Sequence, residues 1–290
     1  MSFVKLQEIV ESAEAQNKPF WKVIIEDDMR ERNVTFEESF ENMRSMYQAM
    51  KQADAAYDPA LKSASGLAGG DGKKLELFRQ QENRLIGDFL TEVMEKAVKM
   101  GESNACMKRI VAAPTAGSCG VIPSVLLTYD EQKNVSEDRL VEALFVAAGI
   151  GEVIAASASI AGAEGGCQAE IGSASAMAAG AIAYLEGGTN EDITNACALA
   201  MKNMLGLTCD PVAGLVEVPC IKRNVSGAVN AVVSSQMALA GIRSAIMPDE
   251  VIDSMRRIGK LLPTCLKETG QEGLAVTPTA QQVVKKLRNS

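Results

Sequence analysis

The chain of 290 residues contains no histidine. This absence excludes Ser-His-Asp and Cys-His catalytic triads, Cys2His2 zinc sites and every metal centre built on imidazole. A general base must therefore be a carboxylate, a lysine, a thiolate or a group supplied by another chain.

The chain also has fewer basic than acidic residues, 29 against 37, no CxxC pair and no uninterrupted apolar run long enough to span a membrane. Its formal net charge of −8 argues against a nucleic-acid partner. The most apolar region, 144–171, is interrupted by three glutamates, which predicts buried helices and no membrane span. Residues 1–17 are charged and amphipathic, unlike a secretory signal. Seven cysteines without such a signal favour a reducing compartment, so we expect a cytoplasmic protein.

The hydrophobic pattern predicts a mostly α fold. Apolar residues recur with helical spacing, and no alternating run is long enough to require a sheet. We expect a compact helical catalytic domain with Gly/Ala-rich buried helices at 61–290, preceded by an N-terminal helical flank at 1–60 that is either part of the same domain or a docking arm. Capping boxes at Thr35/Glu38 and Thr189/Asp192 predict two helix starts, and Ser2 is predicted to cap a first helix from Phe3.

Two segments rich in small residues are candidate ligand sites. The loop at 62–74 and the turn within 108–129 interrupt helical or apolar segments, and their backbone amides can hold an anion such as a carboxylate. The loop lacks the Walker spacing, and the alternative for the second segment is a tight turn with Cys119 buried. The candidate substrate-binding residues are Ser65, Gly69, Gly70, Thr115, Ala116, Gly117 and Ser118.

Three cysteines lie at or beside predicted chain turns. Cys167 follows a Gly-Gly pair, Cys209 precedes Asp-Pro, and Cys220 follows a proline. This setting is typical of thiolates that bind a metal centre, whereas a cysteine on a helix face is usually a small buried hydrophobe. Structural zinc and closed iron–sulfur clusters use four cysteines. Three suggest a 4Fe–4S cluster with one open iron, a Lewis acid suited to elimination of water.

These residues also carry a family resemblance. The runs SGLAGGD, APTAGSCGVIP, AGAEGGCQAEIGSASAMAA and GLTCDPVAGLVEVPCIKRN resemble the iron–sulfur L-serine dehydratases, specifically their separate α chain. The resemblance covers about 63–241 and includes steps of 42 and 11 residues between the three cysteines. It implies a largely helical catalytic fold, a 4Fe–4S cluster on Cys167, Cys209 and Cys220, and a partner β chain with a histidine-containing motif.

The reaction that the resemblance implies converts L-serine to pyruvate and ammonia without pyridoxal phosphate. The open iron would polarise the bond from Cβ to the hydroxyl oxygen while a base removes the Cα proton. The sequence singles out no catalytic residue, and the missing histidine suggests that the β chain completes the site. Candidates for the base within this chain are Glu164, Glu170, Asp210, Glu217 and Lys222.

Three other functions fit parts of the same pattern. An iron–sulfur hydro-lyase for another hydroxy acid would differ in its substrate profile. A non-catalytic iron–sulfur protein would have a fully ligated cluster and no turnover. A pyridoxal-phosphate dehydratase would use a lysine with the glycine-rich loop and show the cofactor's absorbance. For the non-catalytic protein, the candidates for a fourth ligand are Cys106, Cys119, Cys197 and Cys265.

Overall fold

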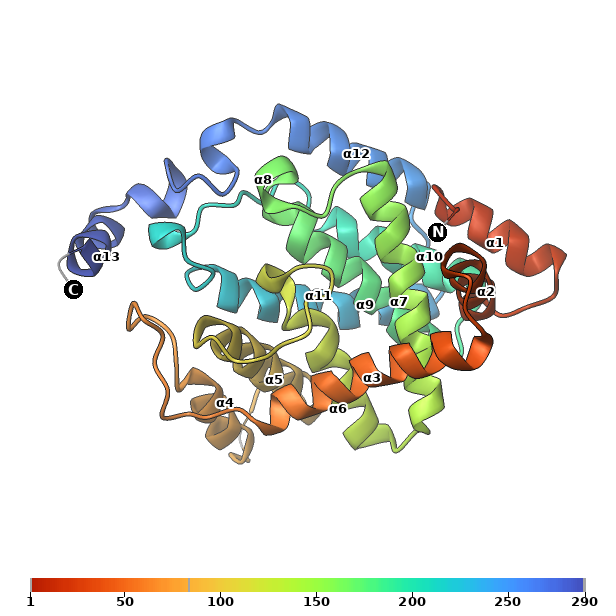
Figure 1. Cartoon of the computed structure of the whole chain (residues 1–290), viewed down its shortest axis with the longest axis horizontal. Helices are drawn as coiled ribbons and strands as arrows, with labels where there is room; N and C mark the ends of the chain where they lie inside the picture. The colour runs from red at the N-terminus through yellow and green to blue at the C-terminus, as the bar shows by residue number, and fades with distance from the viewer. Residues whose placement is uncertain (1, 83, 289–290) are drawn as a thin grey trace.

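The computed structural model describes residues 2–82 and 84–288, and these residues form a helical protein (Figure 1). They contain thirteen α-helices and no strand; one isolated bridge pairs Cys209 with Lys267. The prediction of a mostly α fold is confirmed. In chain order the α-helices are α1 (Leu6–Ala15), α2 (Phe20–Arg32), α3 (Phe36–Ala55), α4 (Asp71–Arg79), α5 (Asp88–Ala105), α6 (Val121–Lys133), α7 (Glu137–Ser157), α8 (Gly162–Gly165), α9 (Ser173–Leu185), α10 (Asn190–Lys202), α11 (Cys220–Leu239), α12 (Pro248–Leu261) and α13 (Pro278–Arg288).

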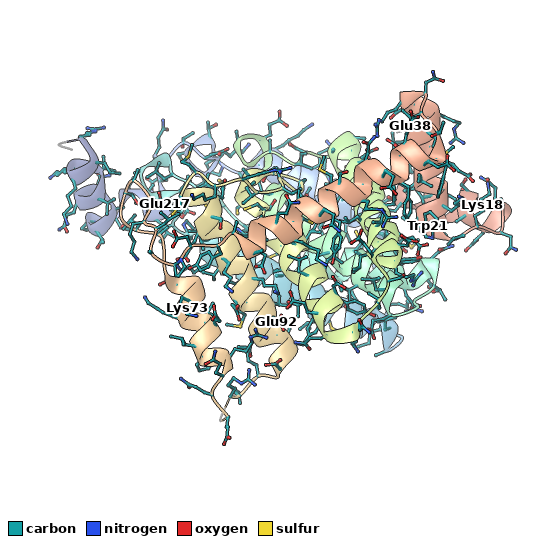
Figure 2. All side chains as sticks on the ribbon, turned by 60° about the horizontal axis from the view of Figure 1, so that its bottom comes forward. Lys18, Trp21, Glu38, Lys73, Glu92 and Glu217 are labelled. Atoms are coloured by element: carbon teal, nitrogen blue, oxygen red, sulfur yellow. The ribbon has the colours of Figure 1, made fainter. Side chains whose placement is uncertain are left out.

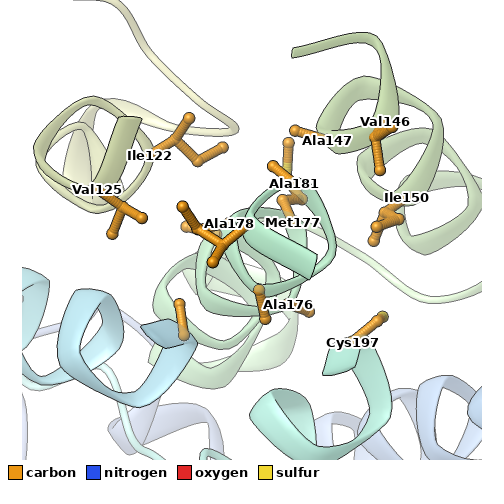
Figure 3. Close-up of a cluster of buried hydrophobic side chains, with 14 of the residues drawn as sticks. Ile122, Val125, Val146, Ala147, Ile150, Ala176, Met177, Ala178, Ala181 and Cys197 are labelled. Atoms are coloured by element: carbon orange, nitrogen blue, oxygen red, sulfur yellow. The ribbon is translucent and has the colours of Figure 1, made fainter. Parts of the chain in front are cut away.

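Helix α9 forms the centre of the core. Nine of the thirteen residues in its sequence, SASAMAAGAIAYL, are Ala, Ser or Gly, and all thirteen are buried. Because alanine and glycine allow helix axes to approach closely, α9 is surrounded by α6, α7, α10 and α11. Figure 3 shows side chains from α6, α7, α9 and α10 meeting there, including Cys197 of α10.

Glycine lies at two close approaches between α7 and α9. A Cβ atom at Gly180 would lie 2.2 Å from Ile150 Cδ1, and one at Gly151 would lie 2.7 Å from Met177 Cε. Neither glycine can gain a side chain without moving its neighbour. Helix α7 is long and apolar enough to cross a membrane, and 67% of its apolar window is buried among the other helices.

The first three helices pack on the same core. Leu6, Phe20 and Tyr47 are buried in one continuous cluster with the side chains of α7 and α9. The capping boxes predicted at the starts of α3 and α10 are both present. The Ser2 prediction is wrong, because this residue bonds Asp27 through its amide and hydroxyl.

The irregular segments gather at one end of the molecule. Figure 1 shows the loop before α4, the chain between α10 and α11, and α13 at the end opposite α1 and α2. Short helical turns lie between α-helices along the chain: η1 (Ala116–Ser118), the π-helical η2 (Gln168–Gly172), η3 (Val212–Gly214), η4 (Thr264–Leu266) and η5 (Gly273–Val276). Most of the predicted site residues lie on or beside them.

Candidate metal centre

Each of the three singled-out cysteines lies where a helix begins or where regular structure is interrupted. Cys167 directly precedes η2, Cys209 lies in extended chain between α10 and η3, and Cys220 is the first residue of α11. All three are buried, with exposed fractions of 3%, 3% and 8%. Of the remaining four cysteines, Cys197 lies within the helical core, Cys106 and Cys265 are partly exposed, and Cys119 is buried beside η1.

The three thiols lie close enough to affect one another's ionisation. Burial raises the pKa of Cys209, and the charges of Cys167 and Cys220 raise it further. Burial also raises the pKa of Cys220 to about 12, with a contribution from Cys167, and raises that of Cys167 to about 11. Without a cation these side chains are therefore neutral thiols, and a bound metal centre would favour their deprotonation.

A site for a single ion is not formed by these residues. Within residues 2–82 and 84–288, no three His, Cys, Asp or Glu side chains come together as ligands of one metal ion. In a multi-iron cluster each thiolate bonds a separate iron, so the sulfur atoms need not converge on a single ion. Three neighbouring, buried and unpaired thiols are a donor set that suits such a cluster.

Arg223 places a positive charge beside the thiols. Its guanidinium pairs with Asp210 at 2.9 Å and donates to Thr208 O at 2.6 Å. It also lowers the pKa of the Cys167 thiol, although the effect of burial is larger. Asp210 in turn accepts a hydrogen bond from the amide of Leu274 at 2.9 Å. One arginine thus ties the chain around Cys209 to Cys167.

The predicted turn at 115–118 meets the partly buried carboxylate of Glu170 at this centre. Thr115 Oγ1 donates to Glu170 Oε1 at 2.7 Å. A Cβ atom at Gly117 would lie 2.9 Å from Glu170 Oε1, and one at Gly162 would lie 2.9 Å from Oε2 and 3.2 Å from Cys209 Sγ. Burial raises the pKa of Glu170. The two glycines therefore leave room for a carboxylate beside Cys209.

The remaining residues of the turn bond within the turn or to α5. Ser118 is fully buried, and its hydroxyl hydrogen-bonds with Thr115. The carbonyl of Ala116 accepts from Asn104 Nδ2 at 3.2 Å. Of the four residues predicted here, Thr115 and Gly117 are the two that contact or closely approach Glu170.

The glycine-rich loop reaches the same centre through Glu217, three residues before Cys220. The hydroxyls of Ser63 and Ser65 both donate to Glu217 Oε2, the former at 2.8 Å. Figure 2 shows Glu217 beside this loop. Gly69 and Gly70 have φ values of +123° and +83°, a backbone conformation that favours glycine. The loop therefore presents the Ser65 hydroxyl toward the residues that precede Cys220.

The amide of Gly69 is already bonded within the protein. Together with the amides of Asp71 and Gly72 it donates to the carboxylate of Glu102, which is 1% exposed. A side chain of α5 thus occupies the anion-binding backbone that the glycine pattern predicts.

Sequence reasoning missed Glu102, Arg223 and Asn224. The last two follow Cys220 at three and four positions along α11, so they share its helix face. Polar residues at that spacing after a candidate ligand are a signal that could have identified them. Glu102 lies far from the loop in sequence, and no local pattern indicates its role.

Comparison with known proteins agrees with these features. The serine dehydratase alpha chain family matches residues 15–275. The probable L-serine dehydratase alpha chain of Bacillus subtilis is 46% identical over 285 residues, covering 98% of this chain and 95% of the relative. The L-serine dehydratase alpha chain of Peptoniphilus asaccharolyticus is 38% identical over 279 residues, covering 96% and 95%. An L-serine dehydratase of Helicobacter pylori is 45% identical over 181 residues, covering 61% of this chain and 40% of that protein. The chain therefore belongs to the serine dehydratase alpha chain family.

Proposed function

We propose that this chain is the α subunit of an L-serine dehydratase that converts L-serine to pyruvate and ammonia. The observation that carries the proposal is the gathering of Cys167, Cys209 and Cys220 beside the Thr115 turn, in a chain whose relatives bear that enzyme's name. The proposed cofactor is a 4Fe–4S cluster held by these three thiolates, with no role for pyridoxal phosphate.

The proposed roles of the protein follow from the positions of its side chains. When bound, the cluster supplies a Lewis-acidic iron that favours departure of the substrate hydroxyl. The Arg223 guanidinium stabilises the Cys167 thiolate, because a neighbouring cation favours the charged form. Burial of the three cysteines keeps water from the thiolates.

Among the five candidate bases, Glu170 is the best placed to hold a proton. Its Oε1 accepts from Thr115, while Oε2 faces the space between Gly162 and Cys209. A raised pKa brings its proton affinity closer to that needed near neutral pH. The other four candidates have different partners: serine hydroxyls for Glu164 and Glu217, an arginine for Asp210 and an aspartate for Lys222.

Two segments of the chain are proposed to orient L-serine. The Thr115–Gly117 turn lies beside Glu170, and the Ser65 hydroxyl approaches from the glycine-rich loop. We assign the substrate carboxylate and ammonium to these two segments. The amide of Gly69 contributes indirectly, because its bond to Glu102 fixes the loop that carries Ser65.

A β chain is proposed to complete the active site. The relatives matched over nearly their full length are named alpha chains, whereas this chain covers 40% of the Helicobacter pylori enzyme. The chain has no histidine, the side chain most often used as a general base near neutral pH. We assign the base that removes the Cα proton to the partner, so that the proposed role of Glu170 is to hold a proton beside the thiols and not to act as this base.

The test is an anaerobic preparation of the chain with and without its co-expressed partner, with iron and sulfide added and pyruvate formation measured. L-serine should be turned over by the complex and poorly or not at all by the chain alone. Activity should fall in air and return with ferrous iron and reductant, because an iron without a protein thiolate is readily lost. Preference for another hydroxy acid, or activity unchanged after aeration and chelation, would overturn the proposal.

A further inference from the structure

Asn224 is a buried side chain that joins two segments of the centre. It lies one turn after Cys220 on α11 and is 1% exposed. Its Nδ2 donates to Gly117 O at 2.8 Å and to Cys220 O at 2.9 Å, while its Oδ1 accepts from the amide of Gly120 at 2.8 Å. Both amide hydrogens and the amide oxygen are therefore used.

Two of these bonds connect parts of the chain that are more than 100 residues apart. Gly117 and Gly120 lie 107 and 104 positions from Asn224. The same turn presents Thr115 to Glu170, whereas α11 carries Cys220. This one side chain therefore links the turn directly to the first turn of α11, which carries Cys220.

Close backbone packing leaves the turn little room to find another position. A Cβ atom at Gly120 would lie 2.6 Å from Ala97 O and 3.1 Å from the side chain of Asn224. One at Gly101 would lie 3.1 Å from the side chain of Ile221. Helix α5, the turn and the start of α11 thus meet almost at backbone contact.

We propose that Asn224 is a positioning residue, which holds the 115–120 turn in register with Cys220 and thereby places Thr115 and Glu170 for the reaction. Its effect on turnover rests on the proposed function, whereas its effect on the turn does not. A residue that served only to stabilise α11 would act through Cys220 O alone. A positioning residue acts through Gly117 and Gly120.

The helix offers a matched control in Asn230, which also joins helices through its side chain. Its Nδ2 donates to Ser175 Oγ at 2.8 Å and to Ala200 O at 2.9 Å. These bonds tie α11 to α9 and α10, away from the turn. Asn230→Ala therefore removes comparable bonds from the same helix without touching the proposed positioning contact.

A second variant separates the two roles of Asn224 itself. In Asn224→Ser, a serine hydroxyl within a helix can bond the carbonyl four residues earlier, which here is Cys220 O. It is too short to replace the bonds to Gly117 and Gly120. If Asn224 positions the turn, Asn224→Ser should behave like Asn224→Ala; if it serves the helix alone, serine should restore wild-type behaviour.

The experiment compares these three variants with wild type in complex with the partner chain. Hydrogen exchange of the 115–122 backbone is measured without metal, and kcat and KM for L-serine are measured after loading with iron and sulfide. Loss of buried hydrogen bonds predicts exchange about tenfold or more faster in Asn224→Ala and Asn224→Ser. We also expect kcat to fall by about tenfold in Asn224→Ala and Asn224→Ser. In Asn230→Ala, the exchange rate at 115–122 and kcat should both equal those of wild type.

Wild-type exchange at 115–122 in both Asn224 variants would overturn the proposal, as would an equal loss of kcat in Asn230→Ala. Should Asn224→Ala fail to fold, Asn224→Ser still decides between the two roles. Absence of L-serine turnover in the wild-type complex would instead contradict the proposed function, and the exchange result would remain a test of the turn.

Discussion

Replacing Glu102 tests whether a buried carboxylate holds the glycine-rich loop. Its Oε1 accepts from the amides of Gly69 and Asp71, both at 2.9 Å. Its Oε2 accepts from the amide of Gly72 at 3.1 Å and from the hydroxyl of Tyr57 at 2.5 Å. Glu102→Ala removes all four bonds and leaves three backbone amides without this acceptor.

The expected loss follows from the burial of these groups. An unpaired buried donor costs about 1–3 kcal/mol, and bonds to a charged acceptor lie toward the upper end of that range. Because Gly69 and Gly72 are buried while Asp71 is partly exposed, we expect Glu102→Ala to lower the free energy of unfolding by about 3–5 kcal/mol. Glu102→Gln keeps one good acceptor and should lose about half as much. Tyr57→Phe removes a single bond and should cost about 1 kcal/mol.

Urea unfolding of the metal-free chain, followed by circular dichroism, measures the stability lost in each of these three variants. The control is Glu82→Ala, which alters an exposed glutamate and should change the free energy of unfolding by less than about 0.5 kcal/mol. Faster hydrogen exchange at 63–72 should accompany the loss in Glu102→Ala. If Glu102→Ala were no more destabilising than Tyr57→Phe, the carboxylate would not be what holds the loop.

Three further changes test other parts of the structure. Hydrogen bonds from two lysines lower the pKa of Asp71 to about 2, below its usual 3.8. Asp71→Asn should therefore lower the free energy of unfolding at pH 7, and the difference from wild type should vanish as the pH falls from about 4 toward 2. An equal loss at pH 7 and at pH 2 would contradict this. Gly180→Ala should lower the free energy of unfolding by about 1–3 kcal/mol, because its new methyl group meets Ile150 Cδ1. Adding Ile150→Val to this variant removes Cδ1 and should recover part of the loss, as measured by thermal unfolding. No recovery in the double variant would refute the clash. Gly117→Ala should displace Glu170 and lower kcat for L-serine in the complex; unaltered kcat would contradict the role proposed for the contact between this turn and Glu170.

Much of the helical fold follows from local sequence. The capping boxes at Thr35 and Thr189 form as predicted, because each needs only residues three positions apart. The start of α1 follows from local sequence only in part, through Glu8, whose side chain accepts from the amides of Val4 and Lys5. Its amides at Leu6 and Gln7 donate to Asp249, more than 240 residues away, while Ser2 bonds another helix. Such a cap depends on tertiary packing.

The same distinction applies to the candidate centre. Glycine and proline beside the three cysteines singled them out, because these residues mark unusual backbone shapes. The glycine-rich loop was also recognisable as an anion-binding backbone, but the sequence could not show that Glu102 fills it. Asn224 escaped notice because its bonds to Gly117 and Gly120 join distant segments. Local patterns identify candidate ligands, and long-range contacts decide how they are held.

The most direct test of the central claim counts iron and sulfide in the complex, reconstituted without oxygen, for single alanine variants of Cys167, Cys209 and Cys220. Cys197→Ala is the control, because this cysteine is buried in the helical core. The account predicts about four irons per α chain and a brown chromophore in the wild type and in Cys197→Ala, with the chromophore lost in each of the other three variants. Retention of iron and chromophore in any of those three variants, or their loss in Cys197→Ala alone, would contradict a cluster bound at this centre.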